Sequence, residues 1–170
     1  LSYENEVKLK EKQISNLFKQ EGLDINFLGI ESSPVVEGYR NKMEYTFGDE
    51  VKDGPLALGL HRKGRFYEIA EVTHCNIVDK DFTEILLNTL NYFQERNTTY
   101  LSKKDHKGFL RHLVIRRAYS TGEILVNLVT SSDGELDTES FLNMLDGLKL
   151  NGKITGVIHT TNDSLSDVVQ

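Results

Sequence analysis

The side chains best suited to binding a ligand are cations and aromatic rings, which alternate in short runs between residues 39 and 117. Guanidinium and ammonium groups bind phosphates, and an aromatic ring beside them can stack on an unpaired base. The pattern therefore indicates a surface that binds nucleic acid. The candidate binding residues are Arg40, Lys42, Arg62, Lys63, Arg65, Arg111, His112 and Arg116, and the candidate stacking rings are Tyr39, Phe66 and Tyr67.

The distribution of charge supports this interpretation, although the net charge of −6 at first opposes it. Between Arg40 and Arg117 the basic residues outnumber the acidic ones by three, whereas the flanking residues carry a net charge of −9. A phosphate ligand responds to the local patch rather than to the overall charge. The alternative, cations spread evenly over a solvated surface, stays open on composition alone.

Two of the candidate residues lie on the first expected strand of the basic region. Residues 39–47 alternate apolar and polar side chains, which predicts a strand with one buried face. Arg40 and Lys42 should point away from the face of Met43 and Tyr45. If the strands share one sheet, one face or rim of it gathers the guanidinium groups.

A later strand, expected over residues 110–119, carries three more candidate binding residues, Arg111, His112 and Arg116. Simple alternation puts Arg111 on the same face as Leu113 and Ile115, so we expect Arg111 near the end of the strand. It sends His112 and Arg116 to the opposite face.

The sequence offers no clear catalytic group of its own. It has no glycine-rich nucleotide-binding motif, and its five histidines show no metal-binding spacing. Cys75 follows His74, but neighbours in an extended segment point to opposite faces and rarely form a nucleophile pair. From the residues alone, a buried and inert thiol is the favoured reading of Cys75. A single cysteine also excludes an internal disulfide, so cytoplasmic location is the default expectation.

Hydrophobic periodicity predicts an α+β fold. Helices are expected over residues 4–21, 79–95 and 138–148, and strands over 25–30, 39–47, 56–60, 66–70, 110–119, 123–130 and 154–161. We expect a mainly antiparallel sheet with helices packed on one face, preceded by an N-terminal amphipathic helix. The expected division is an N-terminal helix and strand in residues 1–35 and a central domain in residues 36–170.

Both ends of the chain are unlike natural termini. It begins at Leu1 within a helical pattern and stops at the apolar run Val168, Val169 and Gln170. We expect it to be an internal segment of a longer protein.

Several short motifs, in the same order, resemble the central region of the SAM-dependent RNA (uracil-5)-methyltransferases, the RumA/TrmA-like family. They are Tyr39 to Glu44, Leu58 to Phe66, His74 with Cys75, Gly108 to Arg116, Val126 to Thr130, and Asn162 with Asp163 followed by Leu165 to Gln170. Each motif alone is weak, but six in one order are a specific resemblance that covers nearly the whole chain. The opening Leu1 to Glu4 resembles the segment just after the family's cysteine-rich motif.

The resemblance implies a parent enzyme that transfers a methyl group from S-adenosylmethionine to C5 of uridine in RNA. Its nucleophilic cysteine, general base and cofactor loops would lie downstream, so no catalytic residue is assigned here, and residues 1–35 would pack with that missing domain. Cys75 matches the fourth thiolate ligand of a [4Fe–4S] cluster, whose other three ligands would lie upstream. The implied partner is RNA, ribosomal before transfer RNA, with no DNA and no membrane.

Three other interpretations remain open on the sequence. A stand-alone RNA-binding or protein-interaction module would explain the cations without catalysis. A small enzyme of another class would need an acid–base or nucleophilic group that the sequence does not offer. An acidic interaction domain would leave the cations merely solvated, and salt-dependent RNA binding separates it from the RNA-binding interpretations.

Overall fold

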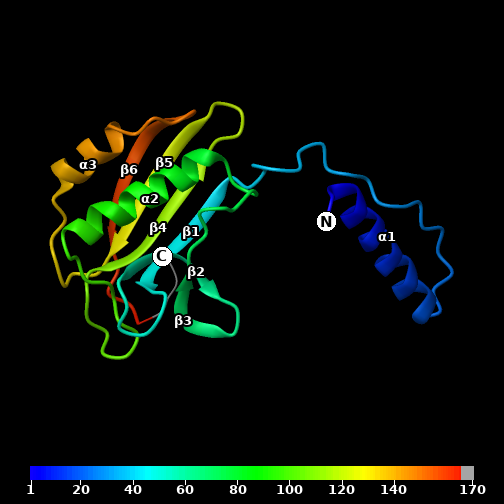
Figure 1. Cartoon of the computed structure of the whole chain (residues 1–170). Coiled ribbons are helices and arrows are strands. Elements are labelled where there is room, and N and C mark those ends of the chain that lie inside the picture. Colours follow the sequence, from blue (N-terminus) through cyan, green and yellow to red (C-terminus); the bar gives the residue numbers. More distant parts are fainter. Residues whose placement is uncertain (166–170) are drawn as a thin grey trace. The chain divides into compact units, whose positions relative to one another are not determined.

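The structure, a computed structural model, describes residues 1–165 of the 170-residue chain, without the side chain of Phe66. The expected stacking ring of Phe66 and the apolar run at residues 168–170 therefore lie outside the described part. The chain divides into two units, one from Leu1 to Glu37 and one that begins at Gly38 (Figure 1). No helix of the described residues is both long enough and apolar enough to cross a membrane.

The first unit consists of helix α1 (Tyr3–Gln20) and a segment after it without regular secondary structure. The helix ends as its sequence predicts, because Gly22 adopts a left-handed φ of 66°. The N–H of Gly22 then donates to the carbonyl of Lys19, and the N–H of Leu23 donates to that of Phe18. This is the Schellman arrangement, which satisfies carbonyls that the helix itself leaves open.

The strand expected over residues 25–30 does not form. These residues have no regular secondary structure and no strand within their unit to pair with, because the only regular element there is α1. The ring of Phe27 instead packs edge-on against Phe18, with 5.8 Å between ring centroids. An apolar segment that has no neighbouring strand to pair with packs against the helix instead of forming a strand.

The second unit contains the other elements, which follow the expected order closely. They are β1 (Lys42–Asp49), β2 (Leu56–Arg62), β3 (Arg65–Ala70), α2 (Lys80–Glu95), β4 (Leu110–Arg117), β5 (Glu123–Thr130), α3 (Thr138–Asp146) and β6 (Lys153–Thr161). The side chain of Asp79 caps α2 by accepting from the N–H of Asp81, and Asp137 caps α3 by accepting from the N–H of Ser140.

The six strands form one sheet in the order β2-β3-β1-β4-β5-β6. The expectation of a mainly antiparallel sheet is wrong, because the sheet is mixed. β5 and β6 pair in parallel along their whole length, and β1 and β3 meet in parallel at Asp49 and Glu68. The connection from β5 to β6 runs through α3. This helical crossover brings the chain back to the level at which β5 starts, so β6 runs in the same direction as β5.

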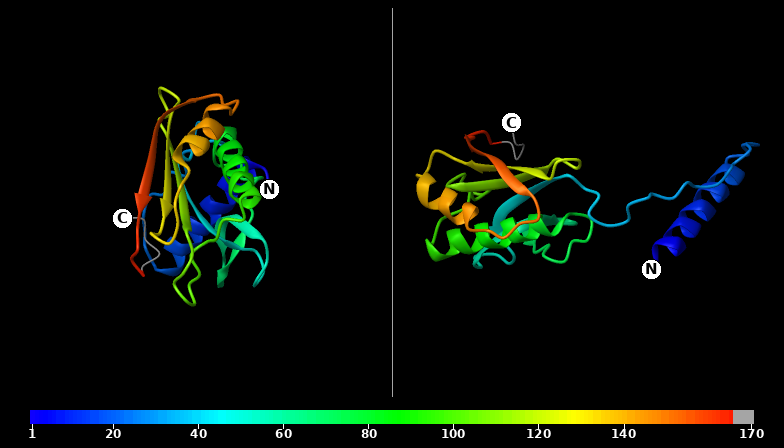
Figure 2. Two further views of the ribbon diagram at one scale, coloured as in Figure 1. Left: turned by 90° about the vertical axis from the view of Figure 1, so that its left-hand side faces the viewer. Right: turned by 90° about the horizontal axis from the view of Figure 1, so that it is seen from above.

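The core lies between one face of the sheet and the two helices α2 and α3, which Figure 2 shows on the same side. Four aromatic rings form its centre: Phe47 of β1, Tyr92 and Phe93 of α2, and Phe141 of α3, with neighbouring centroids 5.0–5.7 Å apart. All four are buried. The expectation that the helices cover one face is confirmed for α2 and α3, and among the described residues of the second unit no helix lies on the opposite face.

The hairpin of β2 and β3 curls back so that both of its strands pair with β1. Two glycines permit this close approach. A Cβ on Gly59 would meet the carbonyl oxygen of Ala70 at 2.0 Å, and one on Gly48 would meet Cγ1 of Ile69 at 2.6 Å. Ile69 is buried. The base of the hairpin is therefore fixed to the sheet by tight backbone packing.

Candidate nucleic-acid interface

Two cations lie side by side on the face of the sheet opposite α2 and α3. Lys42 of β1 and Arg116 of β4 are Cα partners across the ladder. Their neighbours Met43 and Ile115 are buried on the helix side, so alternation turns Lys42 and Arg116 to the open side, as predicted for both. Arg40 is exposed one step before β1, where its Nε donates to the carbonyl of Lys42 at 3.1 Å.

A hollow of about 350 Å³ lies beside this pair, lined by Asn41, Lys42, Arg116, Arg117, Glu123 and Thr155 among others. Arg117 is already neutralised there, because its Nη1 lies 3.3 Å from Asp79 and its Nε 3.9 Å from Asp81. Sequence reasoning missed Thr155 as a residue that lines this hollow. Thr155 lines the hollow because the β5–β6 register is irregular at this point. The sequence contains no pattern that predicts this irregularity.

The tip of the β2–β3 hairpin carries a second group of cations. Arg62 lies 3.3 Å from Glu50 and 3.5 Å from Glu68, and Arg65 lies 2.9 Å from Glu68. Lys63 is exposed at the turn between them. Ion pairs this exposed contribute little to stability, so a phosphate can compete for these cations at low cost.

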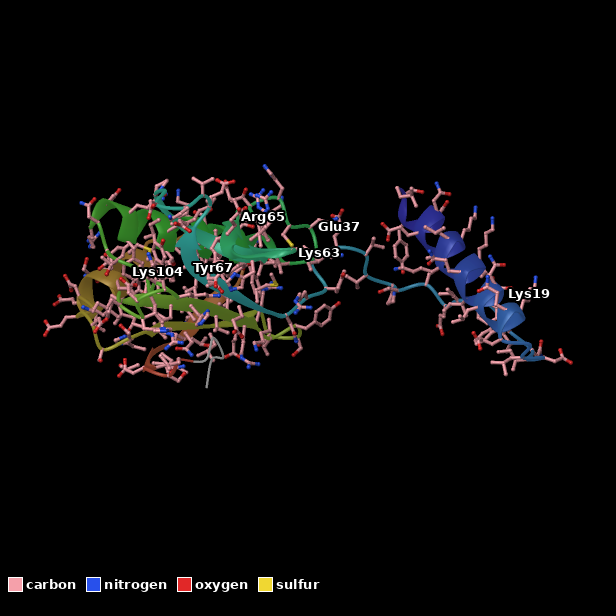
Figure 3. The ribbon with its side chains drawn as sticks, turned by 90° about the horizontal axis from the view of Figure 1, so that it is seen from below. Lys19, Glu37, Lys63, Arg65, Tyr67 and Lys104 are labelled. Atoms are coloured by element: carbon pink, nitrogen blue, oxygen red, sulfur yellow. The ribbon has the colours of Figure 1, made fainter. Side chains whose placement is uncertain are left out.

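The loop between α2 and β4 brings further cations to the hairpin. The Nζ of Lys103 lies 3.4 Å from Nε2 of His61 on β2. Figure 3 shows Lys104 of this loop together with Lys63, Arg65 and Tyr67 of the hairpin. The fold thus gathers cations from segments about 40 residues apart in the chain.

Two neighbouring hydrogen bonds hold this loop in place. Burial, and then a hydrogen bond to Asp49, raise the pKa of Tyr100 to about 12, so its phenol stays protonated at neutral pH and donates to that carboxylate. A hydrogen bond from Ser102, above all, lowers the pKa of Asp105, which stays ionised. Tyr100 thereby ties the loop to β1, and Ser102 with Asp105 shapes the turn beside Lys103.

Arg111 and His112 differ from the other candidates because both are buried. The prediction that Arg111 faces the side of Leu113 is wrong. The β4–β5 register shifts between Leu110 and His112, and this bulge turns Arg111 into the same small hollow as His112. A bulge of this kind breaks the period of two on which the prediction depended.

Both buried cations bind neighbouring protein groups. Nη1 of Arg111 donates to the carbonyls of Asn162 and Ser164, the latter at 2.8 Å. Nδ1 of His112 lies 3.3 Å from the hydroxyl of Thr46. These contacts anchor the segment after β6 to the open face. A direct contact of Arg111 or His112 with nucleic acid stays a prediction.

Cys75 is half-buried in the loop between β3 and α2, where its N–H donates to the carbonyl of Val72 at 3.2 Å. It packs beside Tyr45, and the pKa of Tyr45 is raised by burial and then by the charge that a Cys75 thiolate carries. The neighbouring His74 is exposed. In the part of the chain that the structure describes, no three His, Cys, Asp or Glu side chains converge as a metal site does.

Similar proteins give these surfaces a context. No protein-family model matches the sequence. The chain is 48% identical over 170 residues to an uncharacterized RNA methyltransferase of Caldanaerobacter subterraneus, covering 99% of this chain and 38% of that protein. It is 46% identical over 171 residues to one of Clostridium tetani, covering 100% of this chain and again 38% of the relative. The chain thus spans 38% of the length of these relatives.

A solved structure has a similar fold. It is the crystal structure of the Pyrococcus abyssi tRNA (uracil-54, C5)-methyltransferase in complex with S-adenosyl-L-homocysteine, with a TM-score of 0.69 and 23% sequence identity. The similarity covers 99% of this chain and 37% of the other. At this level of identity the likeness establishes the fold.

The contrast between Arg111 and Arg116 can be tested by replacing each with methionine. We expect Arg111→Met to lower the free energy of unfolding by about 1–3 kcal/mol, because it leaves the carbonyls of Asn162 and Ser164 without their donor. Arg116→Met, the matched control at an exposed site, should change it by no more than about 0.5 kcal/mol. Urea denaturation followed by circular dichroism measures both. Equal stability of the two variants would contradict the anchoring role of Arg111.

Proposed function

We propose that this chain, which belongs to the RNA methyltransferase family, is the central part of an enzyme that methylates C5 of uridine in RNA. The observation that carries the proposal is identity of 46–48% to proteins named RNA methyltransferases along its whole length. The position of the methyl group is a finer inference. It is supported by the sequence motifs and by the name of the Pyrococcus protein, a tRNA (uracil-54, C5)-methyltransferase.

The role proposed for this chain is to hold RNA, and the exposed cations support it. Lys42 and Arg116 form one pair on the open face, and Arg62, Lys63 and Arg65 form a second group on the hairpin. Phosphate contacts of this kind fix the register and orientation of a nucleic acid without reading its sequence. The chain would thus position an RNA strand for chemistry performed elsewhere in the protein.

S-adenosylmethionine would supply the methyl group, and the residues of this chain do not fit it. Nucleotide-like cofactors are commonly bound by a glycine-rich turn between a strand and a helix. The described helix α2 instead starts from the capping carboxylate of Asp79, and α3 from that of Asp137. We therefore assign the cofactor, and every step of methyl transfer, to the part of the protein outside these 170 residues.

A [4Fe–4S] cluster is a separate part of the proposal and concerns Cys75 alone. The chain has one cysteine, and a cluster commonly takes four thiolates, so these residues cannot hold it by themselves. The half-buried thiol of Cys75, in a loop with exposed neighbours His74 and Asn76, is placed where another chain segment could approach it. In the whole protein Cys75 would supply one ligand.

Ribosomal RNA is the proposed substrate. Cys75 matches a cluster ligand of the family, and the family members that carry the cluster act mainly on ribosomal RNA. Transfer RNA is the alternative, raised by the name of the Pyrococcus protein. A module that binds RNA or protein without catalysis is the competing function, and the activity of the whole protein decides between them.

The reaction is tested with the full-length protein, methyl-labelled S-adenosylmethionine, and unmodified ribosomal and transfer RNA. We expect label to enter ribosomal RNA and nuclease digestion with mass spectrometry to identify it as 5-methyluridine. The 170-residue chain alone should transfer no methyl group and show no heat of binding with the cofactor. Label on another nucleoside, or micromolar cofactor binding by the chain alone, would overturn the assignment.

The role of Cys75 is tested by Cys75→Ser in the full-length protein. We expect loss of the cluster's visible absorbance and of most of its iron, because the hydroxyl is a poor substitute for a thiolate ligand. In the 170-residue chain the unmodified thiol should react with a labelling reagent without denaturant, since it is only half-buried. Unchanged iron content in the variant would remove the ligand assignment, and labelling only after unfolding would remove the accessible placement.

A further inference from the structure

The aromatic side chain of Tyr67 on β3 is unusually exposed, with 76% of its surface open to water. Most large rings of this unit are buried in the core against α2 and α3. A tyrosine on a strand normally packs against a neighbouring strand or helix, because that burial is what favours it there. The exposure of Tyr67 is therefore not explained by the packing of the fold.

The strand that carries Tyr67 is held rigidly. Ile69, two residues later, is buried against Gly48 and Gly59, where no room exists even for a Cβ. β3 also pairs with β2 on one side and meets β1 at Glu68 on the other. An exposed ring on a fixed strand loses little conformational freedom when a ligand contacts it, and such preorganisation favours binding.

Cations lie close to the ring along the same hairpin. Arg65 is two residues before Tyr67, on the same side of the strand by alternation and about 7 Å away. Glu68 lies 2.9 Å from Arg65 and 3.5 Å from Arg62, so one carboxylate orients both guanidinium groups. Lys63 lies at the turn of the hairpin and is exposed.

A second segment, the loop between α2 and β4, adds positive charge near the hairpin. In Figure 3, Tyr67 is drawn between Lys104 of the α2–β4 loop and the pair Lys63 and Arg65 of the hairpin. The contact of Lys103 with His61 at 3.4 Å joins that loop to the hairpin. The α2–β4 loop therefore brings its cations to the hairpin that carries the ring.

We propose that Tyr67 is a stacking platform for an unpaired base of RNA, with the phosphates on either side of that base bound by the hairpin and loop cations. The inference rests on the proposed RNA-binding function and adds the class of RNA that this surface takes. An aromatic face stacks on a base of any identity, but only where the base is not already stacked within a duplex. The hairpin therefore selects single-stranded or looped RNA over continuous double helix.

The experiment measures the affinity of the 170-residue chain for a fluorescent 12-nucleotide single strand of RNA and for the same strand in a duplex. We expect the parent chain to prefer the single strand. Tyr67→Ala should weaken single-strand binding about tenfold and leave duplex binding unchanged, as loss of one stacked base does. Tyr67→Phe, which keeps the ring, should bind like the parent. Thermal melting should be unaltered in both variants, because the side chain is exposed.

Tyr119→Ala is the control, since Tyr119 is equally exposed, at 74%, but lies in the β4–β5 turn away from the hairpin. It should not change the preference for the single strand. Parent-like binding by Tyr67→Ala, or an equal loss for single strand and duplex, would overturn the stacking role while leaving RNA binding intact. A parent chain that binds neither RNA would overturn the proposed RNA-binding function, and this inference with it.

Discussion

Burial of one face of the sheet against α2 and α3 is the constraint on which the rest of this structure depends. The buried aromatic rings of Phe47, Tyr92, Phe93 and Phe141 meet at that interface. Because both helices lie on the same side, the polar members of each alternating strand are left on the other side. The cation pair of Lys42 and Arg116 is a direct consequence of this one-sided burial.

The parallel strand β6 depends on a second, polar constraint. The buried carboxylate of Asp81, near the start of α2, accepts hydrogen bonds from the N–H groups of Asn151 and Gly152 at 2.7 and 2.8 Å. Gly152 lies so close to the carbonyl of Gly122 that a Cβ there would be 2.3 Å from that oxygen. Asp81 thereby fixes the point at which the chain re-enters the sheet after α3. Arg117 balances the charge from β4, at 3.9 Å.

The sequence predicted the local elements well because each has a local cause. The capping carboxylates of Asp79 and Asp137, and the left-handed Gly22, mark helix ends through hydrogen bonds within a few residues. Strand alternation likewise placed Lys42 and Arg116 correctly on the face away from the helices.

The features that sequence reasoning missed depend on distant contacts. The direction of β6 is set by the α3 crossover, and the strand expected over residues 25–30 lacks a partner within its unit. The bulge at Arg111 inverts its face, and its burial depends on carbonyls some 50 residues away.

These observations divide the work of the proposed enzyme between positioning and chemistry, with positioning assigned to this chain. Charge gathered on the hairpin is central to that account, although the chain as a whole is acidic. The most direct measurement is the salt dependence of RNA binding by the parent chain and by the double variant Arg62→Ala, Arg65→Ala. The account expects the logarithm of affinity to fall linearly with the logarithm of salt concentration, with a slope smaller by roughly 1.5 in the double variant. Equal affinity and equal slope for parent and variant at low salt would contradict it.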